Sequence, residues 1–310
     1  MEETRNLVLV HTPGWQDVAD LEEIGARVRR IAPDIEVLIA TNTSPCSLTR
    51  KTAARRPSLI FSPIKLLAFR PSRGKIYEAQ IMNKLDELTR LKKAGLPVPE
   101  YEVIRPGIRL SPDRYGSYVV VKPSYELSSW GQGIELHRTG NVRFREPAEY
   151  PDNHPGRWAP MIAQKYIDCG KPMTCRVLTL FGVPILTYLR EATGSVVLDH
   201  LSEPYPQTAF MPIDQEMNIS STRDPEYVAL AAAAYQAIPE AALQACDILR
   251  DREGKLHLLE VNPGGGTWMF SNKFASAYRK ALGVHDLTTE FDAFETCARL
   301  LVERTRAEAC

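Results

Sequence analysis

Short apolar runs dominate the first part of the chain. Residues 7–10, 35–40 and 58–61 are each compact and apolar, which is typical of short buried strands. Between the first two runs, residues 18–31 carry apolar side chains three and four positions apart, so one side of a helix would be apolar. Strand, helix and strand at this spacing predict a small parallel α/β unit.

The clearest helical pattern follows at residues 77–94, where leucine and isoleucine recur at helical spacing. Gly95 suits the C-cap of this helix, and Pro97 ends it. The pattern further predicts strands at 117–123, 161–168 and 175–190 and helices at 225–237 and 287–304.

Near the end of the sequence, two apolar runs are separated by a short polar turn. Residues 245–249 and 256–262 predict two strands of a hairpin, with Asp-Arg-Glu-Gly as the turn between them. Glu260 and Asn262 lie two positions apart on one strand, so their side chains point to the same face. Asp247 on the paired strand can reach that face too.

Two carboxylates and an amide oxygen form a hard, all-oxygen ligand set that suits Mg²⁺, an ion that often works beside nucleotide phosphates. An ordinary solvated hairpin with charged edges is the alternative. Two details favour the metal site. Glu260 interrupts an apolar run, where an unpaired carboxylate would be costly to bury. In addition, Pro263 is followed by three glycines, whose backbone can approach a ligand closely.

Composition and charge narrow the class of protein. The chain has 310 residues with 44% hydrophobic content, enough for cores in two or three domains. Its 38 basic and 38 acidic side chains balance, which argues against a nucleic-acid-binding or membrane-surface protein. The six cysteines show no metal-finger spacing, and no signal peptide or membrane span is evident. We therefore expect a cytoplasmic protein of enzyme size.

Lys122 ends an apolar strand and precedes a loop rich in Ser and Gly. Its ammonium could reach a phosphate, and the Ser128 and Ser129 hydroxyls with the loop N–H groups could cover other phosphate oxygens. The alternative is a lysine that extends from a strand into an ordinary hairpin. The sequence contains neither the P-loop nor the dinucleotide-binding glycine pattern.

Residues 163–167 end another apolar strand. Such a segment can hold an adenine ring between apolar side chains and offer backbone N–H and C=O groups to its edge. An ordinary edge strand is the alternative for this segment taken alone.

Taken together, these segments resemble the ATP-grasp superfamily, in the order of that family. The match begins with Asn83-Lys84 and the Gly95-Leu96-Pro97-Val98 run, continues through Lys122 and its loop, and includes Gln164-Lys165-Tyr166-Ile167. It ends with Asp247 and the Glu260-Val261-Asn262-Pro263 run, so it covers about residues 77–275. The early segments look most like D-alanine–D-alanine ligase. The Gln164–Ile167 stretch and Thr174-Cys175-Arg176 look closer to the ribosomal-protein glutamate ligases.

The resemblance implies roles for particular residues. Lys84 and Lys122 would grip the phosphates of ATP, beneath a small loop that contains Ser128, Ser129 and Gly131. The adenine-binding segment would consist of Gln164, Lys165, Tyr166 and Ile167. Two Mg²⁺ ions would be held by Asp247, Glu260 and Asn262.

The chain also departs from the family pattern. Leu127 replaces a usual loop glycine, so the loop is expected to be stiffer. Thr174 lies near the place of the acidic residue that commonly holds the ribose, and Asp168 could stand in for it. The arginine often found two residues before the metal-binding aspartate is Ala245 here, so Arg176 or Arg190 could supply the positive charge in the reaction.

The fold implied by the resemblance is an α+β / α/β arrangement in three parts. A small N-terminal α/β domain (1–76) would precede a central lid domain (77–165) and a C-terminal domain with the metal site (166–310). ATP would lie between the last two.

The function implied is that of an ATP-dependent carboxylate–amine ligase. Such an enzyme transfers a phosphoryl group from ATP to a carboxylate, and an amine then attacks the acylphosphate, releasing ADP and phosphate. No side-chain nucleophile is required, and none of the six histidines is expected to be catalytic. A kinase on the same scaffold and a nucleotide-binding protein without turnover remain alternatives.

The substrates are expected to be amino acids or peptides, held between a basic and an acidic segment. Residues 49–75 carry eight basic side chains and no acidic one, whereas residues 191–218 carry acidic groups that include Glu191, Asp199 and Glu203. Opposite charges would orient the two substrates toward each other. The donor carboxylate is expected near Arg70, Arg73, Arg176 or Arg190, with Gly264 and Gly265 close to the substrate. The chain could also form a homodimer.

Overall fold

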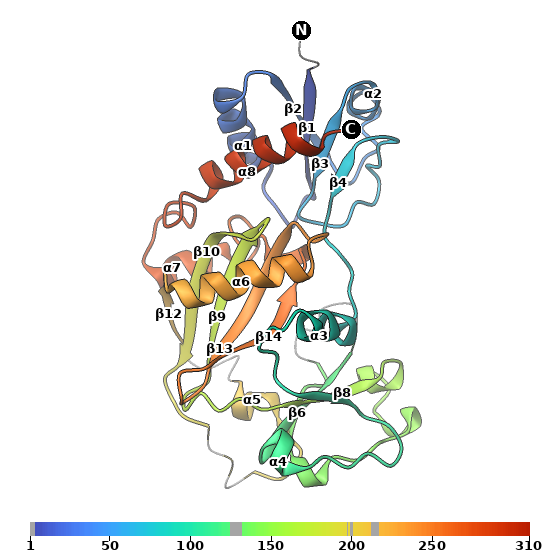
Figure 1. The fold of residues 1–310 in the computed structure, drawn as a ribbon, viewed down its shortest axis with the longest axis vertical. Helices are drawn as coiled ribbons and strands as arrows, with labels where there is room; N and C mark the ends of the chain where they lie inside the picture. The colour runs from blue at the N-terminus through green and yellow to red at the C-terminus, as the bar shows by residue number, and fades with distance from the viewer. Residues whose placement is uncertain (1–3, 125–131, 197, 199–200, 212–216) are drawn as a thin grey trace.

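The computed structural model describes residues 4–124, 132–196, 198, 201–211 and 217–310. Its strands form three separate sheets, arranged one after another along the longest axis of the molecule (Figure 1). The sheet that is last in sequence lies between the other two, so the order in space differs from the order along the chain. This confirms the mixed α and β class that the sequence predicts.

The N-terminal sheet is parallel, with the strand order β2-β1-β3-β4. Its strands and helices are β1 (Arg5–His11), α1 (Val18–Ile31), β2 (Ile35–Thr41), α2 (Ser47–Arg55), β3 (Ser58–Phe61) and β4 (Lys75–Tyr77). The three predicted strands and the predicted helix of this region are therefore confirmed. Helix α2 was not predicted, because its sequence offers few apolar side chains and buries only Ala53.

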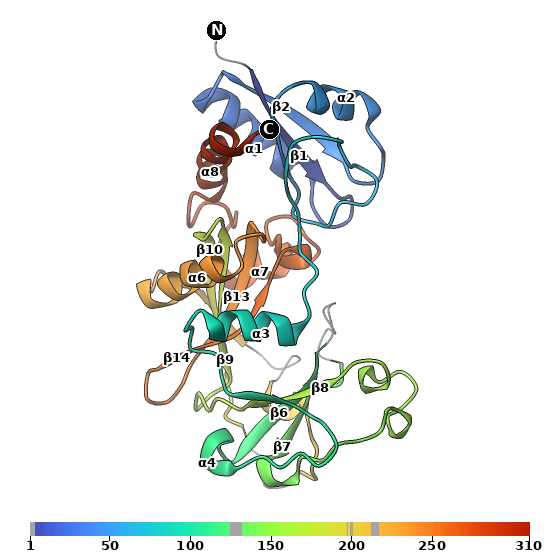
Figure 2. The same ribbon diagram turned by 45° about the vertical axis from the view of Figure 1, so that its right-hand side comes forward.

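The last helix of the chain, α8 (Ala293–Glu308), packs on α1 and completes the core of the N-terminal sheet. Figure 2 shows α8 beside α1, although the two helices lie far apart in the sequence. Phe294 and Leu301 of this helix share one buried cluster with Leu9 of β1 and Leu178 of β9, so the core runs without interruption from the first sheet into the third. The helix starts six residues later than the predicted 287–304 segment and ends four later.

The sheet that comes second in sequence is called the middle sheet below, although it lies at one end of the molecule. It is antiparallel, with the order β11-β7-β6-β8-β5. Its strands are β5 (Tyr101–Val103), β6 (Tyr118–Pro123), β7 (Glu135–Arg138), β8 (Met161–Lys165) and β11 (Tyr205–Pro206). The short helices of this part are α4 (Pro112–Tyr115), η1 (Thr139–Asn141), η2 (Pro147–Glu149), η3 (Pro155–Arg157) and α5 (Gln207–Phe210).

The third sheet is also antiparallel, with the order β12-β10-β9-β13-β14. Its strands are β9 (Met173–Leu180), β10 (Val183–Ala192), β12 (Met217–Ser221), β13 (Leu243–Arg250) and β14 (Leu256–Asn262). The helices around it are α3 (Lys84–Lys93), α6 (Pro225–Ala237), η4 (Gly265–Thr267) and α7 (Ala275–Leu282).

Alternation along its strands gives the third sheet two different faces. Val177 and Cys246 point to one face, where they are fully buried with Ala231 of α6 and Leu91 of α3. Residues one position away along these strands point to the opposite face, and Asp247 is among them. The apolar packing of α6 and α3 thus fixes the register that turns the charged side chains toward the middle sheet.

The prediction of a helix over 77–94 is wrong in its first seven residues. Helix α3 begins at Lys84, because the Asn83 side chain accepts a hydrogen bond from the Leu85 N–H at 2.8 Å and caps the helix. The preceding chain is held away from a helix, since the Gln80 N–H donates to the Pro263 carbonyl at 2.9 Å. No helix in the described part of the chain is long and apolar enough to cross a membrane.

Candidate functional site

A row of polar side chains crosses four strands of the third sheet. Strand pairing places Tyr188 opposite Arg176, Arg176 opposite Asp247, and Asp247 opposite Glu260. Asn262 follows two positions after Glu260 on β14, so it lies on the same face. The hairpin predicted from sequence therefore brings the three proposed metal ligands together.

Arg176 grips Asp247 through two parallel hydrogen bonds. Its Nε donates to Oδ1 at 2.7 Å, and its Nη2 donates to Oδ2 at 2.6 Å. Burial alone would lower the pKa of Arg176, but Asp247 outweighs it and holds the pKa well above the ordinary value. The Asn262 side chain lies against both carboxylates, because its Nδ2 donates to Asp247 Oδ2 at 3.2 Å and to Glu260 Oε1 at 3.3 Å.

Lys84 reaches the same site from helix α3. Its Nζ lies 3.2 Å from Glu260 Oε2 and 3.1 Å from Glu87 Oε2. Burial opposes ionisation of the Glu260 carboxyl, yet the nearby cations, led by Lys84 and Lys122, lower its pKa to about 2. Glu260 is therefore charged at neutral pH, and its side chain, 25% exposed, lines the cavity described below.

Lys122 approaches from the opposite side, at the end of β6 in the middle sheet. The residue is 7% exposed, and burial lowers the pKa of its ammonium, although Glu260 opposes this shift. A buried cation with no carboxylate at salt-bridge distance among the described residues is suited to an anionic ligand.

One cavity of 290 Å³ is lined by Lys122, Arg176, Asp247 and Glu260 but not by Lys84 or Asn262. Ten residues proposed from the sequence line it: Lys122, Gln164, Lys165, Tyr166, Ile167, Thr174, Arg176, Arg190, Asp247 and Glu260. The cavity lies between the middle and third sheets, since Gln164 belongs to β8 and Arg176 to β9. Its apolar part was missed by sequence reasoning and includes Val120, Ile134, Phe210, Met211, Met217, Leu249 and Leu259.

The apolar end of this cavity has the features of a nucleobase site. The ring of Tyr166 meets Phe210 edge to face, with centroids 6.2 Å apart. Gln164 is 1% exposed, and its amide nitrogen and oxygen have no hydrogen-bond partner within the described residues. An amide with a free donor and a free acceptor can form hydrogen bonds with the acceptor and donor groups along the edge of a purine base. The N–H groups of Lys165 and Tyr166 are already used within the protein.

Thr174 and Arg190 face each other across strands β9 and β10 at the edge of the cavity. The Nε atom of Arg190 is buried and without a partner in the described ranges, as is the hydroxyl of Tyr188 two residues before it. Asp168 instead lies at the surface, 3.1 Å from Arg252. Of the two residues considered for the ribose, only Thr174 lines the cavity.

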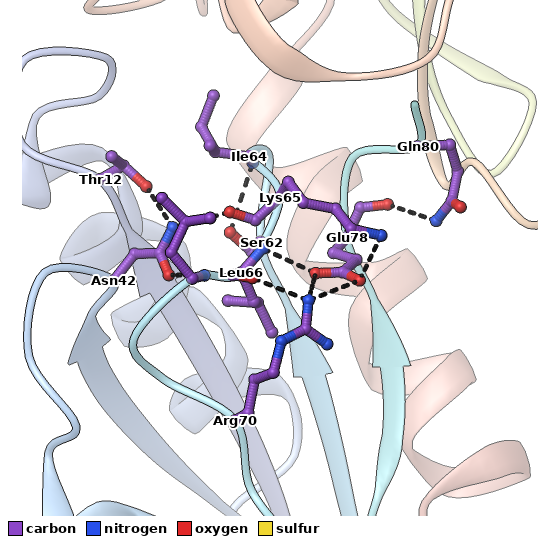
Figure 3. Close-up of polar contacts among 10 residues, drawn as sticks. Thr12, Asn42, Ser62, Ile64, Lys65, Leu66, Arg70, Glu78 and Gln80 are labelled. Atoms are coloured by element: carbon purple, nitrogen blue, oxygen red, sulfur yellow. Dashed lines mark hydrogen bonds and ion pairs between the residues drawn. The ribbon is translucent and has the colours of Figure 1, made fainter. Parts of the chain in front are cut away.

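Arg70 and Arg73, the predicted substrate residues of the basic segment, do not line the cavity. Arg70 is held by the protein itself, since Nη2 donates to the Leu66 carbonyl at 2.7 Å and lies 3.3 Å from Glu78 Oε2 (Figure 3). Arg73 is exposed. A side chain on Gly264 would meet Ala79 at 2.5 Å, and its φ of +98° favours glycine, so this glycine permits a close approach within the chain.

Glu191 and Glu203 of the acidic segment 191–218 lie in different parts of the structure. Glu191 pairs with Lys171 near the end of β10, at 3.9 Å. Glu203 lies on the other face of the middle sheet, where it accepts hydrogen bonds from the Arg138 N–H and the Asn141 amide. The three proposed residues of the phosphate loop, Ser128, Ser129 and Gly131, lie outside the described part of the chain, as does Leu127. Asp199 also lies outside it.

Glu87 was missed by sequence reasoning. It is 1% exposed, and it faces β14 from helix α3. The one available signal was its position three residues after Lys84, which puts both side chains on the same side of a helix that also carries the buried Leu88 and Leu91.

The residues present fit a divalent cation of the hard type. Asp247, Glu260 and Asn262 converge within hydrogen-bond distance, with the Nδ2 atom of Asn262 turned toward the two carboxylates. Half a turn of this amide would bring its oxygen into the set, and oxygen atoms are the ligands that Mg²⁺ prefers. Asp247 Oδ2 accepts from both Arg176 and Asn262, whereas Oδ1 accepts from Arg176 alone among the described residues and keeps a lone pair for an ion. The described residues contain no group of three His, Cys, Asp or Glu side chains arranged for a metal, so the amide of Asn262 is needed as the third ligand.

Comparison with solved structures identifies the fold. D-cycloserine synthetase DcsG superposes with a TM-score of 0.53 at 14% identity, over 96% of this chain and 99% of that one. The ATP-grasp ligase PsnB, in a complex with a precursor variant, Mg and ADP, gives 0.52 at 14% identity, over 98% and 100% of the two chains. D-alanine–D-alanine ligase from Bacillus anthracis gives 0.50 at 15% identity, over 98% and 99%.

This chain therefore has the ATP-grasp fold, as the order of its motifs predicts. Neither a protein-family profile nor a curated protein sequence matches it. At 11–15% identity, the likeness to these structures is one of fold.

Proposed function

We propose that the protein is an ATP-dependent carboxylate–amine ligase. The observation that carries the proposal is the single cavity in which a nucleobase-like end and the buried Lys122 face Asp247 and Glu260. The three compared proteins are described as a synthetase and two ligases, and one of them is complexed with Mg and ADP. Their shared fold supports a ligase with the same nucleotide and metal.

The chain's own residues would each handle one part of the nucleotide. Gln164 and the Tyr166–Phe210 pair would hold the base, and the ammonium groups of Lys84 and Lys122 would bind the phosphates. Asp247, Glu260 and Asn262 would hold Mg²⁺, with two ions proposed. The bound Mg²⁺ would neutralise charge on the transferring phosphoryl group.

The proposed reaction has two steps. A carboxylate oxygen of the donor attacks the γ-phosphorus of ATP, the bond to the bridging oxygen breaks, and ADP leaves. The amine then attacks the carbonyl carbon of the acylphosphate, phosphate leaves with the former carboxylate oxygen, and the amine loses a proton to form the amide. Enclosure between two sheets would keep water from the reactive intermediate.

Arg176 and Arg190 are the arginines best placed for the donor, because both line the cavity. Arg190 has a buried Nε without a partner in the described structure, so a carboxylate or phosphoryl oxygen could accept a hydrogen bond from it. Arg70 would first have to leave Glu78 and the Leu66 carbonyl. We therefore assign the donor to the Arg190 side and propose an amino acid or peptide as the amine acceptor.

The test is ADP release by the purified protein with Mg²⁺, ATP and a library of amino acids and dipeptides. Formation of ADP, phosphate and a new amide in equal amounts is the expected result. AMP and pyrophosphate as products would overturn the acylphosphate mechanism. A stable phosphorylated product without an amide would instead identify a kinase, and bound ATP without turnover on any substrate would identify a nucleotide-binding protein.

A further inference from the structure

Glu87 holds a position in the site that no motif assigns. Its carboxylate divides its two oxygens between two elements: Oε1 accepts the Val261 N–H at 2.7 Å, and Oε2 lies 3.1 Å from Lys84 Nζ. Val261 is the residue between Glu260 and Asn262. One buried carboxylate therefore contacts both the phosphate-binding lysine and the strand that carries two metal ligands.

The contact with Val261 is possible because β14 lies at the edge of the third sheet. Strand β14 is the last strand of the third sheet, so every second N–H points away from β13 and needs another acceptor. The Glu87 carboxylate supplies that acceptor from helix α3. The packing of α3 on β14 is strengthened by the bond from the Leu258 N–H to the Pro97 carbonyl at 2.9 Å, just beyond the helix.

The charge of Glu87 balances the site. With Glu87 ionised, three carboxylates (Glu87, Asp247 and Glu260) face three cations (Lys84, Lys122 and Arg176), and the formal charges cancel. Burial raises the pKa of the Glu87 carboxyl, and the Lys84 ammonium opposes that rise. Lys84 lies between two of these carboxylates at nearly equal distances. If Glu260 turned to a metal ion, Lys84 would keep Glu87 as its partner.

We propose that Glu87 is a positioning residue that makes Glu260 available to the metal. Its carboxylate retains Lys84 when Glu260 binds the ion, and its bond to Val261 keeps Glu260 and Asn262 in register with Asp247. Without this second carboxylate, Lys84 would hold Glu260 alone, and the ion would have to compete with a buried ammonium. The inference rests on the proposed nucleotide and metal site but concerns binding rather than turnover.

The test compares Glu87→Gln with wild type in two binding measurements. Glu87→Gln keeps an oxygen for the Val261 N–H and removes the charge. With Mn²⁺ as the probe ion and saturating ADP, the Kd for Mn²⁺ is expected to rise about tenfold, within the range typical for residues behind metal ligands. The Kd for ADP without metal is expected to stay equal or fall, because the site becomes more positive.

Three further variants distinguish the effect of the Glu87 charge from a displacement of helix α3. Asp86→Asn makes the same change on an exposed neighbour in the same helix and is expected to leave both constants unchanged. Leu91→Ala removes a buried contact of α3 and is expected to lower the Tm without selective loss of Mn²⁺ binding. Glu87→Asp keeps the charge and is expected to retain Mn²⁺ binding within about threefold, well short of the loss expected for the amide.

The proposal would be overturned if Glu87→Gln weakened the binding of Mn²⁺ and of metal-free ADP equally. It would also be overturned if neither Kd changed. Loss of Mn²⁺ binding in Leu91→Ala as large as in Glu87→Gln would also overturn it, because helix displacement would then explain the effect. If Glu87→Gln does not fold, Glu87→Asp decides: a tenfold loss of Mn²⁺ binding in this charged variant would refute a role for the charge. Failure of the wild type to bind ADP with Mn²⁺ would instead refute the proposed function.

Discussion

Carboxylates paired with cations occur both around Glu260 and around Glu78, and the two sets differ in their surroundings. Glu78 lies between Lys65 at 2.8 Å and Arg70 at 3.3 Å, whose side chains remain 37% and 49% exposed (Figure 3). Lys84 and Arg176, which pair with Glu260 and Asp247, are only 19% and 22% exposed. We call these sets the Glu78 network and the cavity network.

The amides near the two networks show what this difference means. Asn42 is 2% exposed and fully used, since it donates to Thr12 Oγ1 and the Lys65 carbonyl and accepts from the Leu67 N–H (Figure 3). Gln164 is equally buried, but its amide has no partner among the described residues. A polar group without a partner is costly to bury, so its retention beside a cavity points to a ligand, whereas a group with all its partners orders the chain.

Glu260→Gln is expected to have the largest effect. The amide is neutral and presents an N–H donor where the metal needs an oxygen anion, so turnover should fall by about 100-fold or more while the fold persists. Turnover at saturating Mg²⁺ and the Tm together check this. An unchanged kcat would show that Glu260 takes no part in the mechanism, and the cavity network would then have no functional difference from the Glu78 network.

Arg176→Ala and Arg70→Ala test the energetic difference between the networks. The first leaves the buried Asp247 without its bidentate partner, so the free energy of unfolding should fall by roughly 3–5 kcal/mol. The second removes a half-exposed partner of Glu78, and the loss should stay within about 1 kcal/mol. Urea unfolding of both variants is the measurement. Equal losses would show that burial does not separate the two networks.

Gln164→Leu and Asn42→Ala test the two amides. Replacement of the unpartnered Gln164 amide by an apolar side chain should leave the Tm unchanged or raise it, and should weaken ATP binding by about tenfold. Asn42→Ala should lower the free energy of unfolding by about 1–3 kcal/mol and leave the Kd for ATP unchanged. Calorimetric ATP titration and thermal unfolding distinguish these outcomes, and a lower Tm in Gln164→Leu would count against a ligand site.

The smallest effect concerns Cys169, which lines the cavity, in comparison with the exposed Cys310. Burial raises the pKa of the Cys169 thiol to about 11, so it is protonated at neutral pH and its alkylation should be slow. The rate should increase as the pH rises toward 11, and ATP should slow it further by covering the thiol. Mass spectrometry of alkylated peptides gives both rates. Alkylation of Cys169 at pH 7 as fast as that of Cys310 would contradict the raised pKa of this half-buried thiol.

Much of the fold could be predicted because the apolar spacing is clear where elements are buried on one face. Helix α6 has the predicted limits of 225–237, and β14 has the predicted limits of 256–262. The start of α3 was missed because tertiary contacts, and not local spacing, hold residues 78–82 outside the helix. The pairing of α8 with α1 was missed because no local pattern encodes a contact between the two ends of a sequence.

For the site, strand alternation was enough to group Glu260 with Asn262, since that inference needs only neighbours on one strand. It could not show that Arg176 grips Asp247, because strand β9 comes between β10 and β13 only in the folded sheet. Nor could it show that Arg70 is engaged by Glu78. Whether a charged side chain is free or paired depends on distant partners, and sequence spacing carries little information about them.

The packing of α8 on the N-terminal sheet also has a consequence for how the chain folds during synthesis. The strands β1, β2 and β3 are synthesised before those of the other two sheets, but their core is closed by Phe294 and Leu301, which are synthesised after all of these strands. Contacts between such distant positions form slowly, and an open apolar face invites aggregation. The N-terminal sheet therefore stays incomplete until α8 has been synthesised, and a nascent chain that stops before α8 would expose the side of β1 that the finished protein buries.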